Sequence, residues 1–224
     1  FPKKISPQQS FLLRKHFPFM GKLSPRERIY FEHRVARFLE TYEFIPREGL
    51  EITEEMKVMI AGTAIKLTFG LRNYLLKVFD KIIVFPSIYY SNTNENWHKG
   101  EFNPRMRAIV FSWEDFLQGF EYSNDNLHLG LHEFAHALHF HGLKSNDVSA
   151  MIFSDMYVKI KEYALQPEIY ERLQNSEYFR IYAFTNSFEF IAVLLEHFFE
   201  TPDQFESEFP ELFQKVRKMI NFRY

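Results

Sequence analysis

Apolar positions recur with a helical period in the first third of the chain. The segment "SPRE" at residues 24–27 places a Ser cap before a Pro and a Glu that can complete a capping box. Apolar residues then continue to about Tyr42, which predicts a helix over 25–42. A second helix is predicted for "EEMKVMIAGTAIKLTF" at 54–69, with Thr53 as its cap and Gly70 as its end.

The pattern changes to short β-branched and aromatic runs in the middle of the chain. "KIIVFP" (81–86) and "RAIVFSW" (107–113) predict strands, whereas the polar run at 91–104 predicts a loop. From residue 126 the pattern is helical nearly to the end, with breaks near Gly142, Pro167, Pro202 and Pro210. We therefore expect an α+β, mostly helical fold with a small central sheet.

No linker or internal repeat divides the 224 residues. We expect a single domain over residues 1–224, made of an N-terminal helical part (1–72) and a core (73–224) that carries the chemistry described below.

Composition excludes several classes of function. A net charge of −2 gives no general attraction to nucleic acid, so no such partner is expected. The absence of cysteine removes disulfides, thiol nucleophiles and Cys-ligated zinc sites. No run is long and apolar enough to span a bilayer, and we expect a cytoplasmic location. The basic segment at 1–17 leaves membrane contact open only through an anchor upstream of Phe1.

The segment "LHEFAHALHFHG" (131–142) carries the strongest chemical signal. On a helix expected to be capped within 124–126 and ended by Gly142, His132 and His136 lie one turn apart, where both imidazoles can bind one ion. Glu133 between them is the general base of the HExxH arrangement. Apolar neighbours bury this helix, and two buried imidazoles beside a buried carboxylate need a partner. The spacing therefore predicts one Zn²⁺ per chain and not a helix with surface histidines.

The third protein ligand is expected downstream, in "SFEFIAVLLEHFFETP" (187–202), where Glu189 and Glu196 interrupt an apolar run. Glu189 is the candidate ligand, although with Asn186 as a helix cap it also fits a capping box without metal. Glu196, two turns further, is expected behind the ligands, orienting a ligand histidine. His139 is the other residue expected to lie close behind them.

Taken in order, these segments resemble the MtfA-like zinc peptidases, peptidase family M90. "LSPRERIYFEHRVARFLE", "EITEEMKVMIAGTAIKL", "KIIVFPSIYY", "RAIVFSWEDFLQGF", "HEFAH" and "NSFEFIAVLLEHFFETPDQFESEFPELF" carry the resemblance over nearly the whole chain. It implies a zincin-like fold of the gluzincin type. His132, His136 and Glu189 would be the zinc ligands and Glu133 the base.

The resemblance also implies a role for Tyr182, seven residues before Glu189, as a donor to the oxyanion of the reaction. Members of the family act as peptidases, with aminopeptidase activity on small substrates, and the family's namesake binds a sugar-uptake repressor. The implied partners are thus a peptide or protein substrate and a transcriptional regulator.

The main hypothesis is a zinc metallopeptidase that hydrolyses peptide bonds through a metal-activated water, with aminopeptidase action as its finer form. The strand at 108–111 would offer its edge to an extended peptide. The alternative is a regulatory protein that binds a transcriptional repressor and has a latent or vestigial zinc site. A third hypothesis, a di-iron protein, rests on a second Glu-x-x-His pair at 95–98, but its polar surroundings predict a loop and not the helix such sites need.

Overall fold

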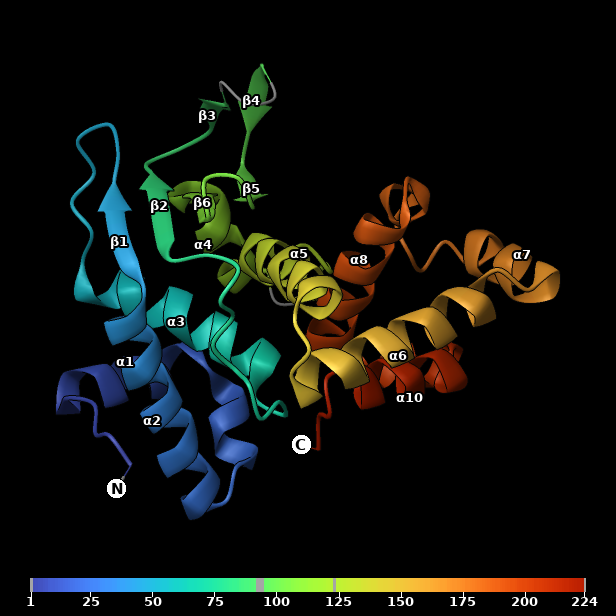
Figure 1. The fold of residues 1–224 in the computed structure, drawn as a ribbon, viewed down its shortest axis with the longest axis horizontal. Helices are drawn as coiled ribbons and strands as arrows, with labels where there is room; N and C mark the ends of the chain where they lie inside the picture. Colours follow the sequence, from blue (N-terminus) through green and yellow to red (C-terminus); the bar gives the residue numbers. More distant parts are fainter. Residues whose placement is uncertain (1, 92–94, 123, 224) are drawn as a thin grey trace.

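The protein is mostly helical, with one small mixed sheet, which confirms the α+β class expected from the sequence (Figure 1). The computed structural model describes residues 2–91, 95–122 and 124–223. The first part of the chain forms α1 (Pro7–His16), the 3-10 turn η1 (Pro18–Lys22), α2 (Pro25–Thr41) and α3 (Glu54–Thr68).

The starts of α2 and α3 agree with the caps predicted from sequence. The Ser24 hydroxyl accepts the Glu27 N–H, and the Glu27 carboxylate accepts the Ser24 N–H at 2.8 Å. The Thr53 hydroxyl accepts the N–H of Met56 in the same way. These local hydrogen bonds satisfy backbone donors that would otherwise lack a partner in the first turn of each helix.

The main sheet has the strand order β1-β2-β6-β5. Its strands are β1 (Glu43–Pro46), β2 (Lys81–Phe85), β6 (Ala108–Ser112) and β5 (Gly100–Asn103). The first three are parallel, and β5 runs antiparallel to β6. A separate hairpin joins β3 (Tyr89–Ser91) to β4 (Asn96–His98) and extends beyond the sheet in Figure 1.

Two expectations about this region are wrong. The segment 91–104 contains β4 and β5 in place of a loop, because strand pairing outweighs its polar composition; residues 92–94 lie outside the described chain. The proposed peptide-binding edge at 108–111 is also wrong, because β6 lies between β2 and β5. The edge strand on this side of the sheet is β5.

Helix α5 (Leu129–Lys144) carries the HExxH segment and differs from its prediction at both ends. It begins at Leu129, capped by the buried His128, whose ring Nδ1 accepts the Leu131 N–H. The expected caps at 124–126 lie outside the helix, where Asn126 has a left-handed φ of 60°. Gly142 lies within the helix instead of ending it. A glycine is needed there for packing, because an added Cβ would lie 2.7 Å from the Phe153 ring of the adjacent helix.

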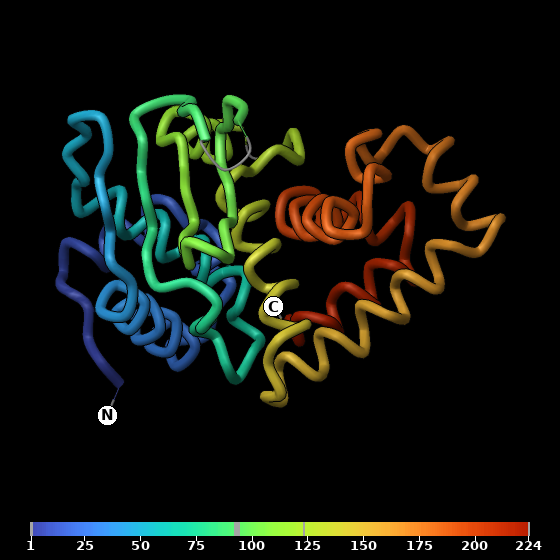
Figure 2. The backbone as a smooth tube through the Cα atoms, turned by 45° about the horizontal axis from the view of Figure 1, so that its top comes forward, coloured from blue at the N-terminus to red at the C-terminus, as the bar shows by residue number. Residues whose placement is uncertain are grey.

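Helix α4 (Trp113–Glu121) follows β6 and lies beside it, on the same side of α5 as the sheet (Figure 1). The helices that follow α5 lie on its other side (Figures 1 and 2). They are α6 (Val148–Ala164), α7 (Pro167–Asn175), the 3-10 turn η2 (Ile181–Phe184), α8 (Ser187–Glu200), α9 (Pro202–Glu208) and α10 (Pro210–Met219). None of the helices in the described ranges is long and apolar enough to cross a bilayer.

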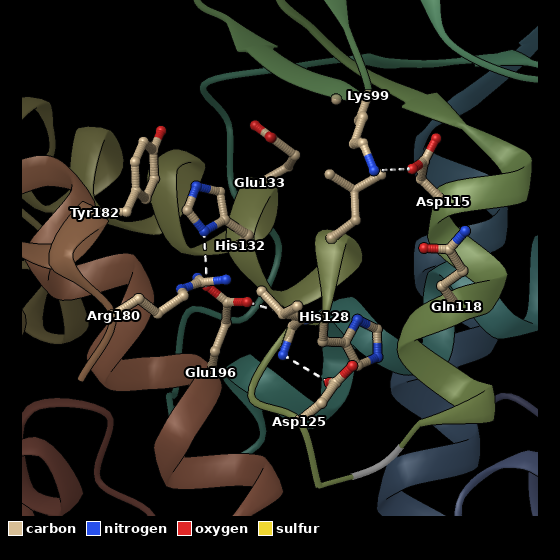
Figure 3. A pocket seen from close by; sticks show the side chains of 13 residues that line it. Lys99, Asp115, Gln118, Asp125, His128, His132, Glu133, Arg180, Tyr182 and Glu196 are labelled. Atoms are coloured by element: carbon tan, nitrogen blue, oxygen red, sulfur yellow. Dashed lines mark hydrogen bonds and ion pairs between the residues drawn. The ribbon is translucent and has the colours of Figure 1, made fainter. Parts of the chain in front are cut away.

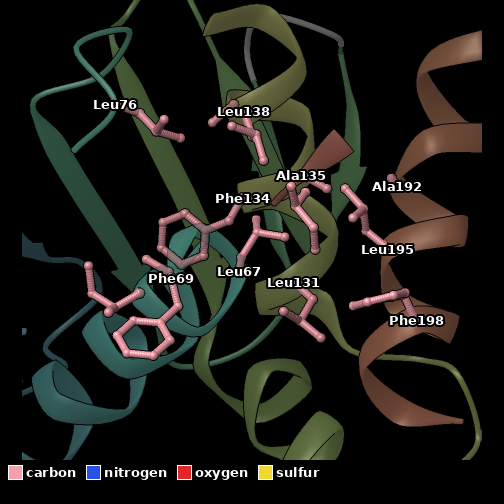
Figure 4. Packing of buried hydrophobic residues seen from close by; sticks show 14 of the residues in the cluster. Leu67, Phe69, Leu76, Leu131, Phe134, Ala135, Leu138, Ala192, Leu195 and Phe198 are labelled. Atoms are coloured by element: carbon pink, nitrogen blue, oxygen red, sulfur yellow. The ribbon is translucent and has the colours of Figure 1, made fainter. Parts of the chain in front are cut away.

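Helix α5 is buried between the sheet and α3 on one side and α8 on the other (Figure 4). Leu131, Phe134 and Leu138 on α5 are at most 1% exposed, as are Ala192 and Leu195 on α8. One cluster of buried side chains includes residues from both the N-terminal helices and the core. This packing fixes α5 and α8 relative to one another, and it is from these two helices that the candidate site is built.

Candidate metal centre

Three potential ligand atoms converge between α5 and α8. The Nε2 atoms of His132 and His136 lie 3.1 Å apart, because the two residues are one turn apart on the same face of α5. Glu189 Oε2, from the first turn of α8, lies 3.1 Å from His132 Nε2 and 3.5 Å from His136 Nε2. All three side chains are partly buried, and the structure brings together the residues predicted as ligands.

This geometry fits a small divalent cation. Ligand atoms at about 2.0–2.1 Å from a tetrahedral zinc ion lie about 3.3 Å from one another, close to the distances above. Glu189 Oε2 is buried and accepts no hydrogen bond from the described residues, which leaves a negatively charged atom that a cation would satisfy. Two imidazoles and one carboxylate, with room for water, are the donor set of a catalytic zinc site.

The side chain of Asn186 caps α8 and sets the direction of Glu189. Its amide oxygen accepts the N–H groups of Phe188, at 2.9 Å, and of Glu189, at 3.0 Å. The carboxylate of Glu189 turns towards the two histidines. The helix cap anticipated from sequence is therefore present, but the Glu189 carboxylate itself faces the metal centre.

The carboxylates around His132 favour a positive charge at this centre. Burial alone would lower the pKa of His132, but the Glu189 and Glu196 carboxylates outweigh burial and raise that pKa to about 10. For Glu189 the opposing effect of burial is likewise outweighed: the two histidines hold the pKa of its carboxyl well below the usual range. The carboxylate is thus ready to bind a positive charge, and a metal ion would have to displace the His132 proton.

Glu133 lies beside the ligands, largely removed from solvent. It is 6% exposed, and its Oε2 accepts the Phe102 N–H of strand β5 at 2.8 Å. Burial raises the pKa of this carboxyl, and the nearby His132 and His136 partly oppose that effect. A carboxyl tuned upward in this way suits a group that must both accept and release a proton near neutral pH.

Tyr182 approaches the centre from η2, on the side opposite β5. Its ring centroid lies 6.0 Å from that of His132, and the side chain points into the same open space as Glu133 (Figure 3). The residue remains 49% exposed. Burial of the hydroxyl and the negative charge of Glu189 raise the pKa of Tyr182 to about 12, so the phenol keeps its proton and can donate a hydrogen bond.

The two residues expected behind the ligands differ in what they contact. Glu196 Oε1 accepts a hydrogen bond from His132 Nδ1 at 2.7 Å, which directs the other ring nitrogen towards the centre. His139 is 1% exposed and stacks on Phe188, with a centroid distance of 4.1 Å. Neither of its ring nitrogens has a hydrogen-bond partner among the described residues, and burial lowers its pKa to about 4. It contributes an uncharged wall to the aromatic packing.

Two groups contribute to the site that the sequence does not predict, the Arg180 side chain and the Phe102 backbone N–H. Arg180 donates a hydrogen bond to Glu196, which places a cation directly behind His132. A signal existed, since a buried carboxylate such as Glu196 calls for a counter-charge. No sequence signal indicates that the Phe102 backbone contacts Glu133, because the polar composition of 91–104 predicts a loop.

A cavity of about 290 Å³ opens beside His132, Glu133 and Tyr182. Its far wall contains Asp115, whose carboxylate binds the Lys99 ammonium at 2.6 Å and accepts the Ser112 hydroxyl. The space is large enough for a side chain or a short backbone segment, and it is directly continuous with the candidate centre.

The di-iron hypothesis does not fit this arrangement. His98 lies on the short strand β4, whereas a carboxylate-bridged pair of irons needs both Glu-x-x-His pairs on facing helices. Within the described part of the chain, the cluster with metal-binding geometry is His132, His136 and Glu189.

Comparison with known proteins also indicates a metallopeptidase family. Residues 2–221 match the family model described as glucose-regulated metallo-peptidase M90. The chain is 26% identical to an uncharacterized protein of Synechocystis sp., over 97% of this chain and 85% of that protein. It is 28% identical to Mlc titration factor A of Yersinia pestis and to that of Yersinia pseudotuberculosis, over 95% of this chain and 85% of each relative.

Proposed function

The chain belongs to the glucose-regulated metallo-peptidase family M90, and we propose that it is a zinc-dependent peptidase. One observation carries this proposal: His132, His136 and Glu189 converge as a three-ligand set, and Glu133 faces the same space. A structural zinc site needs four protein ligands and no base, whereas three ligands with an adjacent carboxylate suit hydrolysis.

The metal would be held by the two Nε2 atoms and by the Glu189 carboxylate. When bound, zinc supplies a Lewis acid that makes a water nucleophilic near neutral pH and polarises the carbonyl to be attacked. The choice of zinc follows from the ligand types, since two imidazoles and one carboxylate suit it better than they suit calcium or magnesium.

Glu133 is the proposed general base and, later, the general acid. Its carboxylate takes the proton of the attacking water and passes it to the leaving amine. The hydrogen bond from the Phe102 N–H keeps the carboxylate in one orientation. Tyr182, protonated and half exposed, is the proposed donor to the oxyanion that forms at the substrate carbonyl.

Strand β5 is the proposed site for the substrate backbone. The Ser112 N–H donates to Lys99 O, so residues 99, 101 and 103 pair with β6, and the backbone polar groups of 100 and 102 point away from it. The Phe102 N–H is donated to Glu133, so the Gly100 N–H and the carbonyl oxygens of 100 and 102 are the groups proposed to bind the peptide backbone. An extended peptide can add to such an edge as a further strand. Peptides of four or more residues should then be cleaved more efficiently than dipeptides, and equal kcat/KM values would argue against the edge.

We further propose that the peptidase acts as an aminopeptidase and that it is located in the cytoplasm. A second candidate function is regulatory binding with a latent metal site. It is favoured by the name of two relatives, Mlc titration factor A, and would give this chain a repressor-type protein partner. The placement of Glu133 beside the ligands favours hydrolysis, because binding alone requires no base.

The test is digestion of a mixed peptide library by the zinc-loaded protein, with products identified by mass spectrometry. Glu133→Gln is the matched variant, because it keeps the size of the side chain and leaves all three ligands intact. We expect cleavage by the wild type alone, with one zinc bound to each protein. The product ends then distinguish amino- from endopeptidase action. Cleavage by neither protein, with zinc bound to both, would favour the regulatory function.

A further inference from the structure

Glu196 connects three parts of the site through one buried carboxylate, whose side chain is 2% exposed. Its Oε1 accepts a hydrogen bond from His132 Nδ1, and its Oε2 accepts the backbone N–H of His128 at 2.9 Å. These contacts hold the first turn of α5 against α8. Neither donor need carry a charge, so a buried negative charge remains to be balanced.

Arg180 supplies that balance. Its Nη2 donates to Glu196 Oε1, the same oxygen that His132 contacts, and its side chain is 27% exposed (Figure 3). Among the residues that the structure describes, it is the cation that stays in direct contact with Glu196 once a metal ion has displaced the proton of His132. Removing one partner of such a pair leaves the other charge buried and free to move towards solvent.

Arg180 also begins the turn that carries Tyr182. It is the residue before η2, and its carbonyl oxygen accepts the Ala183 N–H at 2.9 Å. Its backbone thus fixes the start of the turn while its side chain is fixed by α8. The position of the Tyr182 phenol and the orientation of His132 therefore depend on the same ion pair.

We propose that Arg180 is a positioning residue that sets His132 and Tyr182 together through Glu196. The proposal rests on the peptidase function proposed above. The arginine touches neither substrate nor metal in this role. It keeps Glu196 directed at His132, so that the imidazole faces the metal, and it holds the η2 turn so that the phenol lies over the reacting carbonyl.

Other contacts keep the segment folded without Arg180, which makes substitution practicable. Tyr178, two residues earlier, has its hydroxyl 2.7 Å from the Thr201 hydroxyl. The Tyr178 carbonyl oxygen lies 3.0 Å from His197 Nε2. A change at Arg180 should therefore alter orientation at the site more than the path of the chain.

The test compares Arg180→Gln and Arg180→Lys with the wild type. For Arg180→Gln we expect zinc affinity, measured by competition with a chelator, to fall about 10–100-fold. We expect kcat to fall at least about tenfold with KM within about threefold, because substrate binding is not the affected step. Arg180→Lys keeps a cation but not the planar fork, so it should retain zinc affinity within about threefold while kcat still falls.

A double-mutant cycle with Tyr182→Phe separates positioning from a general loss of structure. Arg180→Lys is used in this cycle because it should keep zinc bound. If Arg180 acts through Tyr182, adding Arg180→Lys to Tyr182→Phe at saturating zinc should lower kcat by no more than about twofold further. Arg172→Gln is the control: this arginine of α7 lies over the Phe209 ring and donates to Glu208 O, away from the site. It should leave zinc affinity and kcat unchanged.

Two results would overturn the proposal: zinc affinity of Arg180→Gln within threefold of the wild type, or losses in kcat that multiply across the Arg180→Lys cycle. If Arg180→Gln does not fold by circular dichroism, the Arg180→Lys cycle still decides whether Arg180 acts through Tyr182. If the wild type cleaves no peptide, the proposed function fails, but the zinc-affinity comparison of Arg180→Gln with Arg172→Gln still decides whether Arg180 positions His132.

Discussion

Glu200, at the end of α8, is a carboxyl whose charged form should weaken the fold. Its Oε2 is buried and has no hydrogen-bond partner in the described part of the chain. Burial, then the negative charge of Asp125, raise the pKa of Glu200 to about 7. Lys66 opposes the rise, Glu196 adds slightly to it, and the Asn126 backbone N–H opposes it. Lys66 is itself partly buried, and this burial lowers its pKa to about 8.

The sign follows from proton binding in the two states. Between the ordinary carboxyl pKa of 4.5 and the folded value of about 7, the folded protein holds a proton that the unfolded chain has lost. The free energy of unfolding therefore falls as the pH rises through this window. Full ionisation costs about 3 kcal/mol, of which about 2.5 kcal/mol is lost between pH 5 and pH 8.

Glu200→Gln should remove this loss, because a neutral amide does not ionise. Urea denaturation of the metal-free proteins at pH 5, 6, 7 and 8 measures the effect, and subtraction of the two curves cancels the other titrating groups. The variant should gain about 2.5 kcal/mol on the wild type across this range. Glu171→Gln, an exposed carboxyl of α7, is the matched control and should stay parallel to the wild type. A Glu200→Gln curve that is also parallel would refute the reasoning.

Three further substitutions, the first with a matched control, test packing and the site. Gly70→Ala places a methyl group 2.2 Å from the backbone oxygen of Asn221 and should cost about 1–3 kcal/mol in urea denaturation. Gly21→Ala, with nothing within 4 Å of the new atom, should stay within about 0.5 kcal/mol, and equal losses would contradict this packing. Asn186→Ala removes the cap of α8, so it should cost about 1 kcal/mol and weaken zinc binding in chelator competition; unchanged zinc affinity would count against Glu189 as a ligand oriented by this cap. Tyr182→Phe should lower kcat about 100-fold with little change in KM, and a loss confined to KM would instead indicate a role in substrate binding.

Local signals predicted the parts of the fold that depend on local interactions. Each of these features depends on a segment of only a few residues. The structure agrees with the caps predicted at Ser24 and Thr53 and with the strands predicted for β2 and β6. The spacing of His132 and His136 likewise depends only on one turn of helix. Such features need no knowledge of what packs against them.

Features that depend on distant partners could not be predicted in this way. Strand β5 exists because it pairs with β6, although its own residues are polar or small. Helix α5 starts at Leu129 because buried His128 acts as its cap, and burial lowers the pKa of that histidine to about 3, which keeps the ring neutral and able to accept. The buried Glu196 indicates that a counter-charge is needed, but the sequence does not indicate which cation supplies it, because Arg180 lies sixteen residues away on another element.

The two interpretations of Glu189 that the sequence left open are not exclusive. Asn186 alone accepts the two backbone N–H groups of the first turn, so the helix does not need the Glu189 carboxylate for its cap. A negative charge in that turn is still stabilised by the helix dipole, which lowers the cost of holding an ionised carboxylate beside apolar residues. The same position therefore favours a charged Glu189 before any metal arrives. Because the cap and the proposed ligand are separate residues, a substitution at Asn186 can report on ligand geometry without removing a ligand atom.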